Sequence, residues 1–420
     1  MLLWHAHADG QTTPGVFDLV VASDGSGDYT TVQAAIDAAP EHGVAPYLIF
    51  IKNGVYDELI DIPKEKPFLH LIGQDADSTI IRHTMHCGGK DSDAPEFSVN
   101  CPQSENYRHH AVMDNWAADF YMENVTLENS WGTERQQGPQ ALAIRTFADR
   151  MAFYRCRFRS FQDTWFTTTC DSDRHYIKDC LLEGAVDYIY GSGDVLAEGT
   201  TFYNVRSGAV ITAPCHTHAT YGYVFRDCIV DGNRQAADGR VKLGRPWHNN
   251  PVNVWINTTL RIPVAPEGWT DMGTIPALFA EYGSCHEDGS MADLSGRKRS
   301  YSYKERNSEN RITGSCPNTI SREEAARYSY ENMMMAGDQW NPRLFMEPME
   351  APKNIKYHNG LLRWQPVKQA RGYIVTDGQG RVIAITTAAE TRLRPLRGGW
   401  EGNSVPFTVQ AVGPYGHVGR

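Results

Sequence analysis

The sequence predicts an all-β fold: a parallel β-helix, in which short strands stack coil upon coil, with a few short helices and a small β-sandwich at its C-terminal end. Short apolar strands follow one another from Tyr47 to Leu260, with turn residues rather than helices between them. Related runs recur there at spacings of about 20 to 32 residues, which indicates a solenoid. The last 70 residues have instead the alternating strands of a sandwich.

The repeat is defined by short runs of residues. In each run an aromatic residue is followed by one or two charged residues and then by Asn or Cys. The runs end at Asn124 in Phe-Tyr-Met-Glu-Asn, at Cys156 in Ala-Phe-Tyr-Arg-Cys, at Cys180 in Tyr-Ile-Lys-Asp-Cys and at Cys228 in Val-Phe-Arg-Asp-Cys. If each run forms one coil, equivalent residues of successive coils lie above one another. We therefore expect these four residues to share one buried column.

Composition divides the chain into three parts. Residues 1–15 are expected to be an N-terminal tail or the remainder of a signal peptide, because their apolar stretch is too short for a complete one. Residues 16–346 carry the repeats and form the β-helix domain. A boundary falls in Glu347-Pro-Met-Glu-Ala-Pro352, and residues 351–420 resemble a fibronectin type III sandwich, with a Trp364 strand and a Phe-x-Val-x-Ala-Val strand.

Two helices are expected within the β-helix domain. Thr30 or Thr31 can cap a short amphipathic helix that ends at Pro40 and covers the open end of a sheet. Ser321 and Glu324 form a capping box that begins a helix over about 322–335.

Charge and composition limit the possible partners. A net charge of −10 argues against nucleic acid and anionic membranes. No apolar run reaches the roughly 18 residues that a membrane span needs. Nine cysteines in 420 residues are too few for a disulfide scaffold and fit buried thiols. We expect a monomer.

One pair of carboxylates holds the expected chemistry. Asp163 and Asp187 are 24 residues apart, and each comes seven residues after a repeat cysteine, Cys156 or Cys180. On neighbouring coils the two carboxylates would lie about 5 Å apart. That distance suits a nucleophile beside a proton donor, and it also suits the carboxylate pair of a retaining glycosidase.

Six ordered motifs over roughly residues 16–340 resemble those of the pectin methylesterases, aspartyl esterases built on a right-handed parallel β-helix. The motifs are Val21-Ala-Ser-Asp-Gly-Ser-Gly-Asp-Tyr29, Gly54-Val-Tyr-Asp-Glu58, Gln140-Ala-Leu-Ala-Ile, Gln162-Asp-Thr, Val186-Asp-Tyr-Ile-Tyr-Gly and Leu243-Gly-Arg-Pro-Trp247. The resemblance implies a secreted or periplasmic enzyme that acts on pectin, with no metal and no cofactor.

The resemblance also implies a role for each polar site residue. Asp187 matches the nucleophile that attacks the C6 methyl ester of galacturonate, and Arg245 matches the arginine that holds it. Asp163 matches the general acid and base, and Gln140 and Gln162 match the amides that stabilise the oxyanion. We expect Arg245 to lower the pKa of Asp187, and the charge of Asp187 to raise the pKa of Asp163.

Three aromatic residues are expected to bind substrate. Trp247 would stack on a sugar face, with Tyr190 and Phe166 as a further aromatic wall. By contrast, Tyr56 and Glu58 match a family motif but are expected to hold structure.

Residues 82–110 depart from the family pattern, because this connection is longer than usual. It contains a cluster with zinc-ligand chemistry, although the family chemistry uses no metal. The cluster consists of His83, His86, Cys87, His109 and His110.

Three other functions remain open on the sequence. A hydrolase or lyase that cleaves polygalacturonan could use the same fold, although the Gly-His-Gly and Arg-Ile-Lys signatures of polygalacturonases are absent. A non-catalytic carbohydrate-binding protein would fit the appended sandwich, but every expected polar site residue is present. An esterase for another pectic ester, such as acetyl, could use the same site.

Overall fold

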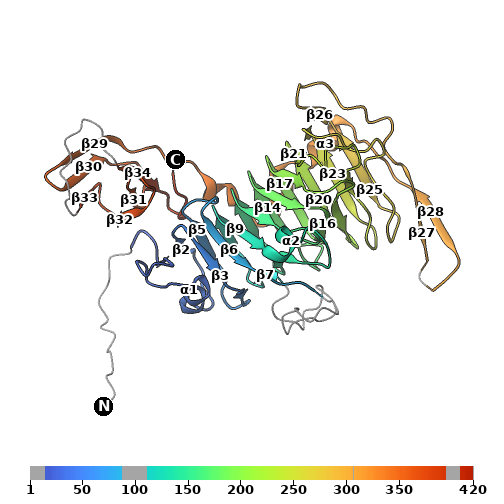
Figure 1. The fold of residues 1–420 in the computed structure, drawn as a ribbon. Coiled ribbons are helices and arrows are strands. Elements are labelled where there is room, and N and C mark those ends of the chain that lie inside the picture. The colour runs from blue at the N-terminus through green and yellow to red at the C-terminus, as the bar shows by residue number, and fades with distance from the viewer. Residues whose placement is uncertain (1–14, 88–110, 306, 394–406, 420) are drawn as a thin grey trace, which may run out of the picture.

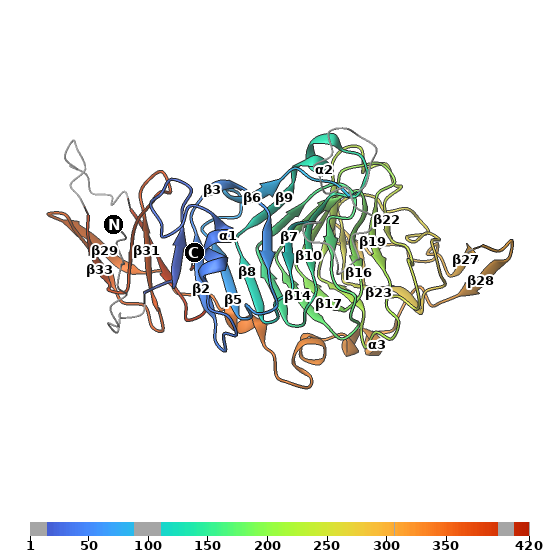
Figure 2. The same cartoon turned by 90° about the horizontal axis from the view of Figure 1, so that it is seen from below.

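The computed structural model describes residues 15–87, 111–305, 307–393 and 407–419, and it confirms the parallel β-helix (Figure 1). The chain passes in turn through three long parallel sheets, and each coil adds one strand to a sheet. Two side views show the coils stacked along one axis (Figures 1 and 2). The apolar side chains between the three sheets form one continuous buried core.

The strands are short, as the sequence predicts. The ten-stranded sheet contains β1 (Leu19–Val21), β2 (Tyr47–Ile51), β5 (Leu69–Gly73), β8 (Phe120–Glu123), β11 (Met151–Tyr154), β14 (Arg174–Lys178), β17 (Asp194–Glu198), β20 (Tyr223–Arg226), β23 (Val252–Ile256) and β25 (Leu278–Tyr282). The nine-stranded sheet contains β3 (Gly54–Asp57), β6 (Thr79–His83), β9 (Thr126–Asn129), β12 (Arg157–Arg159), β15 (Leu181–Gly184), β18 (Thr201–Asn204), β21 (Ile229–Gly232), β24 (Thr259–Leu260) and β26 (Cys285–His286). The seven-stranded sheet contains β4 (Ile60–Ile62), β7 (Ala111–Asn115), β10 (Leu142–Thr146), β13 (Trp165–Phe166), β16 (Val186–Gly191), β19 (Val210–Pro214) and β22 (Lys242–Gly244).

The predicted column of repeat residues is correct for the cysteines and wrong for Asn124. Tyr154 pairs with both Glu123 and Lys178, so Cys156 stacks on Cys180 and on Val125, one residue after Asn124. The backbone N–H of Cys156 accordingly lies 3.3 Å from the Cys180 sulfur.

Asn124 belongs instead to the neighbouring column, at the turn after the strand. Its φ is +54°, and the equivalent residues of the six coils that follow also have positive φ. Asn, Asp and Gly tolerate this left-handed conformation best, so their recurrence marks the turn. The column contains Asn124, Arg155, Asp179, Gly199, Asp227, Asn257 and Gly283.

The helix α1 (Val32–Ala38) covers the first coils, as predicted. Thr31 is its N-cap and accepts from the backbone N–H of Ala34. The Glu58 carboxylate accepts from the N–H groups of Val32 and Gln33 at 2.8 and 2.9 Å, which satisfies two further free donors. Glu58 therefore holds helix α1 in place, in agreement with its expected structural role. Tyr56 is also buried, and its hydroxyl donates to the Lys52 carbonyl.

The outer face of the ten-stranded sheet is covered by residues 322–346. The capping box of Ser321 and Glu324 is present, but α3 (Arg322–Arg327) is shorter than predicted and is followed by a π-helix (Glu331–Met335) and a 3-10 helix (Pro342–Met346). Other elements outside the three sheets are α2 (Ser130–Arg135) and the hairpin of β27 (Ser300–Lys304) and β28 (Arg311–Ser315). No helix among the described residues is long and apolar enough to cross a membrane.

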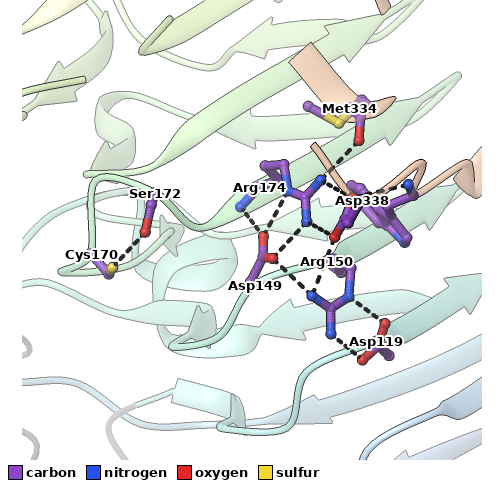
Figure 3. A network of polar contacts seen from close by, with 9 residues as sticks. Asp119, Asp149, Arg150, Cys170, Ser172, Arg174, Met334 and Asp338 are labelled. Atoms are coloured by element: carbon purple, nitrogen blue, oxygen red, sulfur yellow. Dashed lines mark hydrogen bonds and ion pairs between the residues drawn. The ribbon is translucent and has the colours of Figure 1, made fainter. Parts of the chain in front are cut away.

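A network of charged side chains fixes this covering segment to the turns of the β-helix (Figure 3). Arg174 bridges Asp149 and Asp338 at 2.7 and 2.6 Å and donates to the Met334 carbonyl at 2.9 Å. Hydrogen bonding to Arg174 lowers the pKa of Asp338 to about 2. The network joins residues 160 and 164 positions apart in the chain.

The C-terminal residues form two small antiparallel sheets with a core of their own. One sheet contains β29 (Lys353–His358), β30 (Leu361–Gln365) and β33 (Glu390–Arg392), and the other contains β31 (Gly372–Thr376), β32 (Val382–Thr386) and β34 (Thr408–Val412). Leu362, Trp364, Tyr373 and Val375 are buried between them. Four of these strands follow the predicted runs.

The chain end returns to the β-helix. Glu123 is fully buried on β8, and its carboxylate accepts from the Tyr121 hydroxyl at 2.5 Å and from the Val418 backbone N–H at 3.3 Å. His417 Nδ1 lies 2.9 Å from both carboxylate oxygens of Glu123. The C-terminal strands are therefore tied to the β-helix through a buried polar cluster.

We predict that Glu123→Gln lowers the free energy of unfolding by about 1–3 kcal/mol, because the amide keeps only one of the two accepting oxygens and turns an N–H₂ group toward buried donors. Urea unfolding measures the change. Glu331→Gln, at an exposed residue, removes the same charge and should change stability by less than about 0.5 kcal/mol. Equal stability of the two variants would show that the cluster does not fasten the chain end.

Candidate active site

The structure brings Asp163 and Asp187 together on consecutive coils of the seven-stranded sheet. Gln162 pairs with Val186 in a parallel bridge, and the backbone N–H of Asp163 donates to the Val186 carbonyl at 2.9 Å. Asp163 precedes β13, and Asp187 is the second residue of β16. Because neighbouring strands lie about 4.8 Å apart, the two aspartates are next to each other on one surface, as the 24-residue spacing predicts.

Both aspartates have a left-handed backbone conformation that residues other than glycine rarely adopt. The φ angles are +61° at Asp163 and +48° at Asp187. The pairing of β16 with β19 also shifts register between Val186 and Ile189. Such irregularities change the direction in which a side chain points, relative to the regular alternation of a strand. They are frequent at functional sites. The local backbone therefore directs both carboxylates to the same place.

Arg245 holds Asp187 in a two-point contact. Its Nε donates to one carboxylate oxygen at 2.8 Å and its Nη2 to the other at 2.5 Å. Arg245 follows β22, two strands away from β16, and reaches across β19, which carries the small Ala213 in the same row. A bidentate guanidinium fixes the orientation of the carboxylate as well as its charge.

Burial raises the pKa of both carboxyl groups, but not equally. Asp163 is 7% exposed, and burial together with the charge of Asp187 raises its pKa well above the ordinary value. Burial also raises the pKa of Asp187, while the hydrogen bonds and charge of Arg245 act in the opposite direction. Arg245 lowers the pKa of Asp187 as expected, but the loss of water outweighs the ion pair, so the net shift of the Asp187 pKa is upward. The predicted order is kept: Asp163 retains its proton to higher pH.

Two further groups act on the pair. The Tyr190 phenol acts to lower the pKa of Asp163, against the effect of burial, so this residue does more than form an aromatic wall. The charge of Arg206 favours the ionised form of Asp187, and its guanidinium lies 5.6 Å from the centre of the Phe161 ring. Sequence reasoning missed Arg206 because it lies in a connection after β18, outside every motif.

The two glutamines lie at the same edge of the sheet, before β10 and β13. The backbone N–H of Ala141 donates to the Gln162 carbonyl at 3.1 Å, which places Gln140 and Gln162 on adjacent coils. Both are half-buried. A side chain at Gly138 would meet the Gln162 amide oxygen at 2.7 Å, so the glycine leaves room for this amide.

The three aromatic residues pack in series, but only one offers a free surface. Tyr190 lies 5.1 Å from Phe166 and 5.6 Å from Trp247 between ring centres. Phe166 and Tyr190 are 1% and 2% exposed, whereas Trp247 is half-buried. Phe166 and Tyr190 thus support Trp247 from below, and Trp247 is the ring available for stacking on a sugar.

The described histidines of the long connection have other partners. His83 Nδ1 lies 2.8 Å from Asp57, and the His86 ring packs 4.1 Å from the Trp131 ring. His109 and His110 lie outside the described residues. Within the part of the chain that the structure describes, no three His, Cys, Asp or Glu side chains are grouped as metal ligands.

The raised pKa of Asp163 has a consequence for stability. Its folded-state pKa exceeds the unfolded value of about 3.9, so the folded protein loses stability as pH rises from that value through the folded pKa. We predict that Asp163→Asn, which cannot ionise, unfolds at a higher temperature than the wild type at pH 8. The difference should disappear near pH 3.5, and a difference independent of pH would contradict the assignment. Thermal unfolding at both pH values measures it.

Comparison with known proteins identifies related sequences and structures. The sequence model of the Pectinesterase family matches residues 18–320. Pectinesterase 31 of Arabidopsis thaliana is 32% identical over 289 residues, which cover 64% of this chain and 84% of that protein.

Solved structures share the fold. The pectin methylesterase from carrot matches with a TM-score of 0.62 and 26% identity, over 79% of this chain and 96% of that one. The pectin methylesterase from Aspergillus niger matches with a TM-score of 0.55 and 26% identity, over 68% and 90%. The chain therefore belongs to the pectinesterase family of carboxylic ester hydrolases.

Proposed function

We propose that the enzyme hydrolyses C6 methyl esters of galacturonate in pectin, with Asp187 as nucleophile and Asp163 as general acid and base. The observation that carries these roles is the pair itself. Two buried carboxyl groups lie side by side, one is held by Arg245, and the other has the more strongly raised pKa. Such a pair holds about one proton, on Asp163, while Asp187 is ionised.

In the first half-reaction, a carboxylate oxygen of Asp187 attacks the ester carbonyl carbon. The bond from this carbon to the methoxy oxygen breaks, Asp163 gives its proton to that oxygen, and methanol leaves. The galacturonate carbonyl is then joined to Asp187 as an anhydride. The amides of Gln140 and Gln162 lie at the same edge of the sheet and can donate to the oxyanion that forms on the way.

In the second half-reaction, Asp163 is ionised and takes a proton from water. The oxygen of this water attacks the galacturonate carbonyl carbon of the anhydride, and the bond to the Asp187 oxygen breaks. The product is a free galacturonic acid group, Asp187 recovers its carboxylate, and Asp163 is protonated again. Arg245 keeps Asp187 in one orientation through both steps.

Substrate, compartment and oligomeric state belong to the same proposal. A pectin methylesterase with this fold is known in complex with a hexasaccharide. The half-buried Trp247 supports a similar role here, in binding a sugar of the polymer. Because pectin is an extracellular polymer, we place the enzyme outside the cytoplasm, either secreted or periplasmic. We propose that it acts as a monomer.

We predict that Asp187→Asn abolishes methanol release from highly methylated pectin, because the asparagine amide has no carboxylate oxygen to attack the ester and Asp163 is occupied as the proton donor. Asp163→Asn should retain activity reduced by about 10²–10⁴-fold, the usual contribution of a general acid and base. Asp288→Asn, at an exposed residue, is the matched control and should behave as the wild type. More than a few per cent of activity in Asp187→Asn would mean that the nucleophile is another residue.

Following polymer length in the same assay tests the rival reaction. A retaining glycosidase could use a carboxylate pair at this distance. Shortening of the polymer without methanol release would reject the esterase and favour the polygalacturonan-cleaving enzyme.

The pH profile should be bell-shaped, with each limb due to one aspartate. Activity falls with decreasing pH as Asp187 is protonated, and with increasing pH as Asp163 loses its proton, because Asp163 has the higher pKa. In Asp163→Asn the residual activity should lose the alkaline limb and keep the acidic one. We measure kcat/KM on methylated oligogalacturonides from pH 4 to 10. An unchanged alkaline limb would assign it to another group.

A further inference from the structure

The charge of the chain is divided unequally between its two parts. Residues 351–420 contain ten Lys and Arg against three Asp and Glu, a net charge of +7. Because the whole chain carries −10, residues 1–350 carry −17. An acidic β-helix is thus joined to a basic C-terminal unit.

Four of the ten Lys and Arg side chains lie on one face of the β29-β30-β33 sheet. Strand pairing puts Lys356 opposite Arg363, and His358 opposite Leu361 and so in line with Arg392. The alternating residues Leu362 and Trp364 point into the core, so the paired cations point outward. We call this surface the cationic face, and it consists of Lys353, Lys356, His358, Arg363 and Arg392, all of them exposed.

Few acids neutralise the cationic face. Arg363 pairs with Glu390 at 2.7 Å, and Lys353 lies 3.8 Å from Glu350, with both of these lysine and glutamate side chains more than 70% exposed. Within the described residues, no ion pair is recorded for Lys356 or Arg392. Exposed ion pairs contribute little and are easily exchanged, so the cations remain available to a polyanion.

The other sheet of the C-terminal unit fixes the direction of this face. Ile374 of β31 and Val412 of β34 are buried in the same cluster as Leu48 and Ile72 of the β-helix. The β31-β32-β34 sheet therefore packs on the β-helix. Figures 1 and 2 both show β29 and β33 on the far side of β31, away from β2 and β5. The cationic face consequently points outward.

We propose that the cationic face binds de-esterified pectin, the polyanionic product of the reaction. This proposal rests on the proposed function, which converts neutral methyl esters into a row of carboxylates. Adjacent strands place cations about 4.8 Å apart across the sheet and about 7 Å apart along a strand, so one extended polyanion can meet several of them at once. Pectin that is still fully methylated carries no charge for this face to attract.

Binding at the cationic face would counteract the repulsion between the negatively charged β-helix and the de-esterified polymer. With −17 on residues 1–350, the β-helix repels the stretches of polymer that have been de-esterified. A cationic face at the end of the β-helix holds such a stretch, while methylated sugars of the same chain occupy the catalytic site. The C-terminal unit thus keeps the enzyme on partly de-esterified polymer.

The test compares two triple variants of the full chain for binding to immobilised polygalacturonate. Lys353→Gln, Lys356→Gln and Arg392→Gln together remove three charges from the cationic face. Arg299→Gln, Arg322→Gln and Arg327→Gln together remove three charges from exposed residues elsewhere. We expect the first variant to bind about tenfold more weakly than the wild type, and the control to bind within about twofold. Wild-type affinity should also fall as salt is raised from 50 to 300 mM.

Methanol release tests the proposed function, and binding to polygalacturonate tests the cationic face, so the two proposals can fail independently. Both triple variants should release methanol from short methylated oligogalacturonides at the wild-type rate. If the wild type releases no methanol, the proposed function fails, and polygalacturonate binding still decides the role of the face. Equal weakening in both triple variants, or affinity unaffected by salt, would overturn the proposal. So would tighter binding of DNA or anionic vesicles than of polygalacturonate, or a dimer that only the first variant abolishes.

Discussion

The hydrogen bonds between successive coils are the interaction on which the rest of the structure depends. Each coil returns the chain to the same three sheets, so residues at equivalent positions meet their counterparts one strand spacing away. Cys156 on Cys180 inside the stack, and a turn column of left-handed residues beside it, follow from this single geometry. The core is correspondingly continuous from the first coils to the last.

The same stacking creates the active site at a cost in stability. It places Asp163 beside Asp187 in a region from which water is largely excluded, where two negative charges are unfavourable together. The fold accommodates them by giving one a guanidinium partner and leaving the other protonated. Their left-handed backbone is strained as well, and the surrounding ladder of hydrogen bonds holds it in place.

The three sheets of the β-helix have different surroundings. Residues 322–346 and the returning chain end cover the ten-stranded sheet, through the Arg174 network and the Glu123 cluster. The seven-stranded sheet positions the aspartates, at β13 and β16, and Arg245 and Trp247 follow its strand β22. The covered face and the catalytic residues therefore belong to different sheets of the β-helix. One of the two C-terminal sheets packs directly on the first coils.

The sequence by itself determined the β-helix, the C-terminal strands and the pairing of Asp163 with Asp187, because periodicity and motif order are local properties that stacking converts directly into neighbours. It did not determine the register at Asn124, since a shift of one residue between a turn and a core column leaves the pattern almost unchanged. Only the tertiary structure decided three features: the net effect of burial and Arg245 on the pKa of Asp187, the position of Arg206 near Asp187, and the contact of Glu123 with His417. These depend on water exclusion and on residues up to 294 positions apart, which no local pattern records.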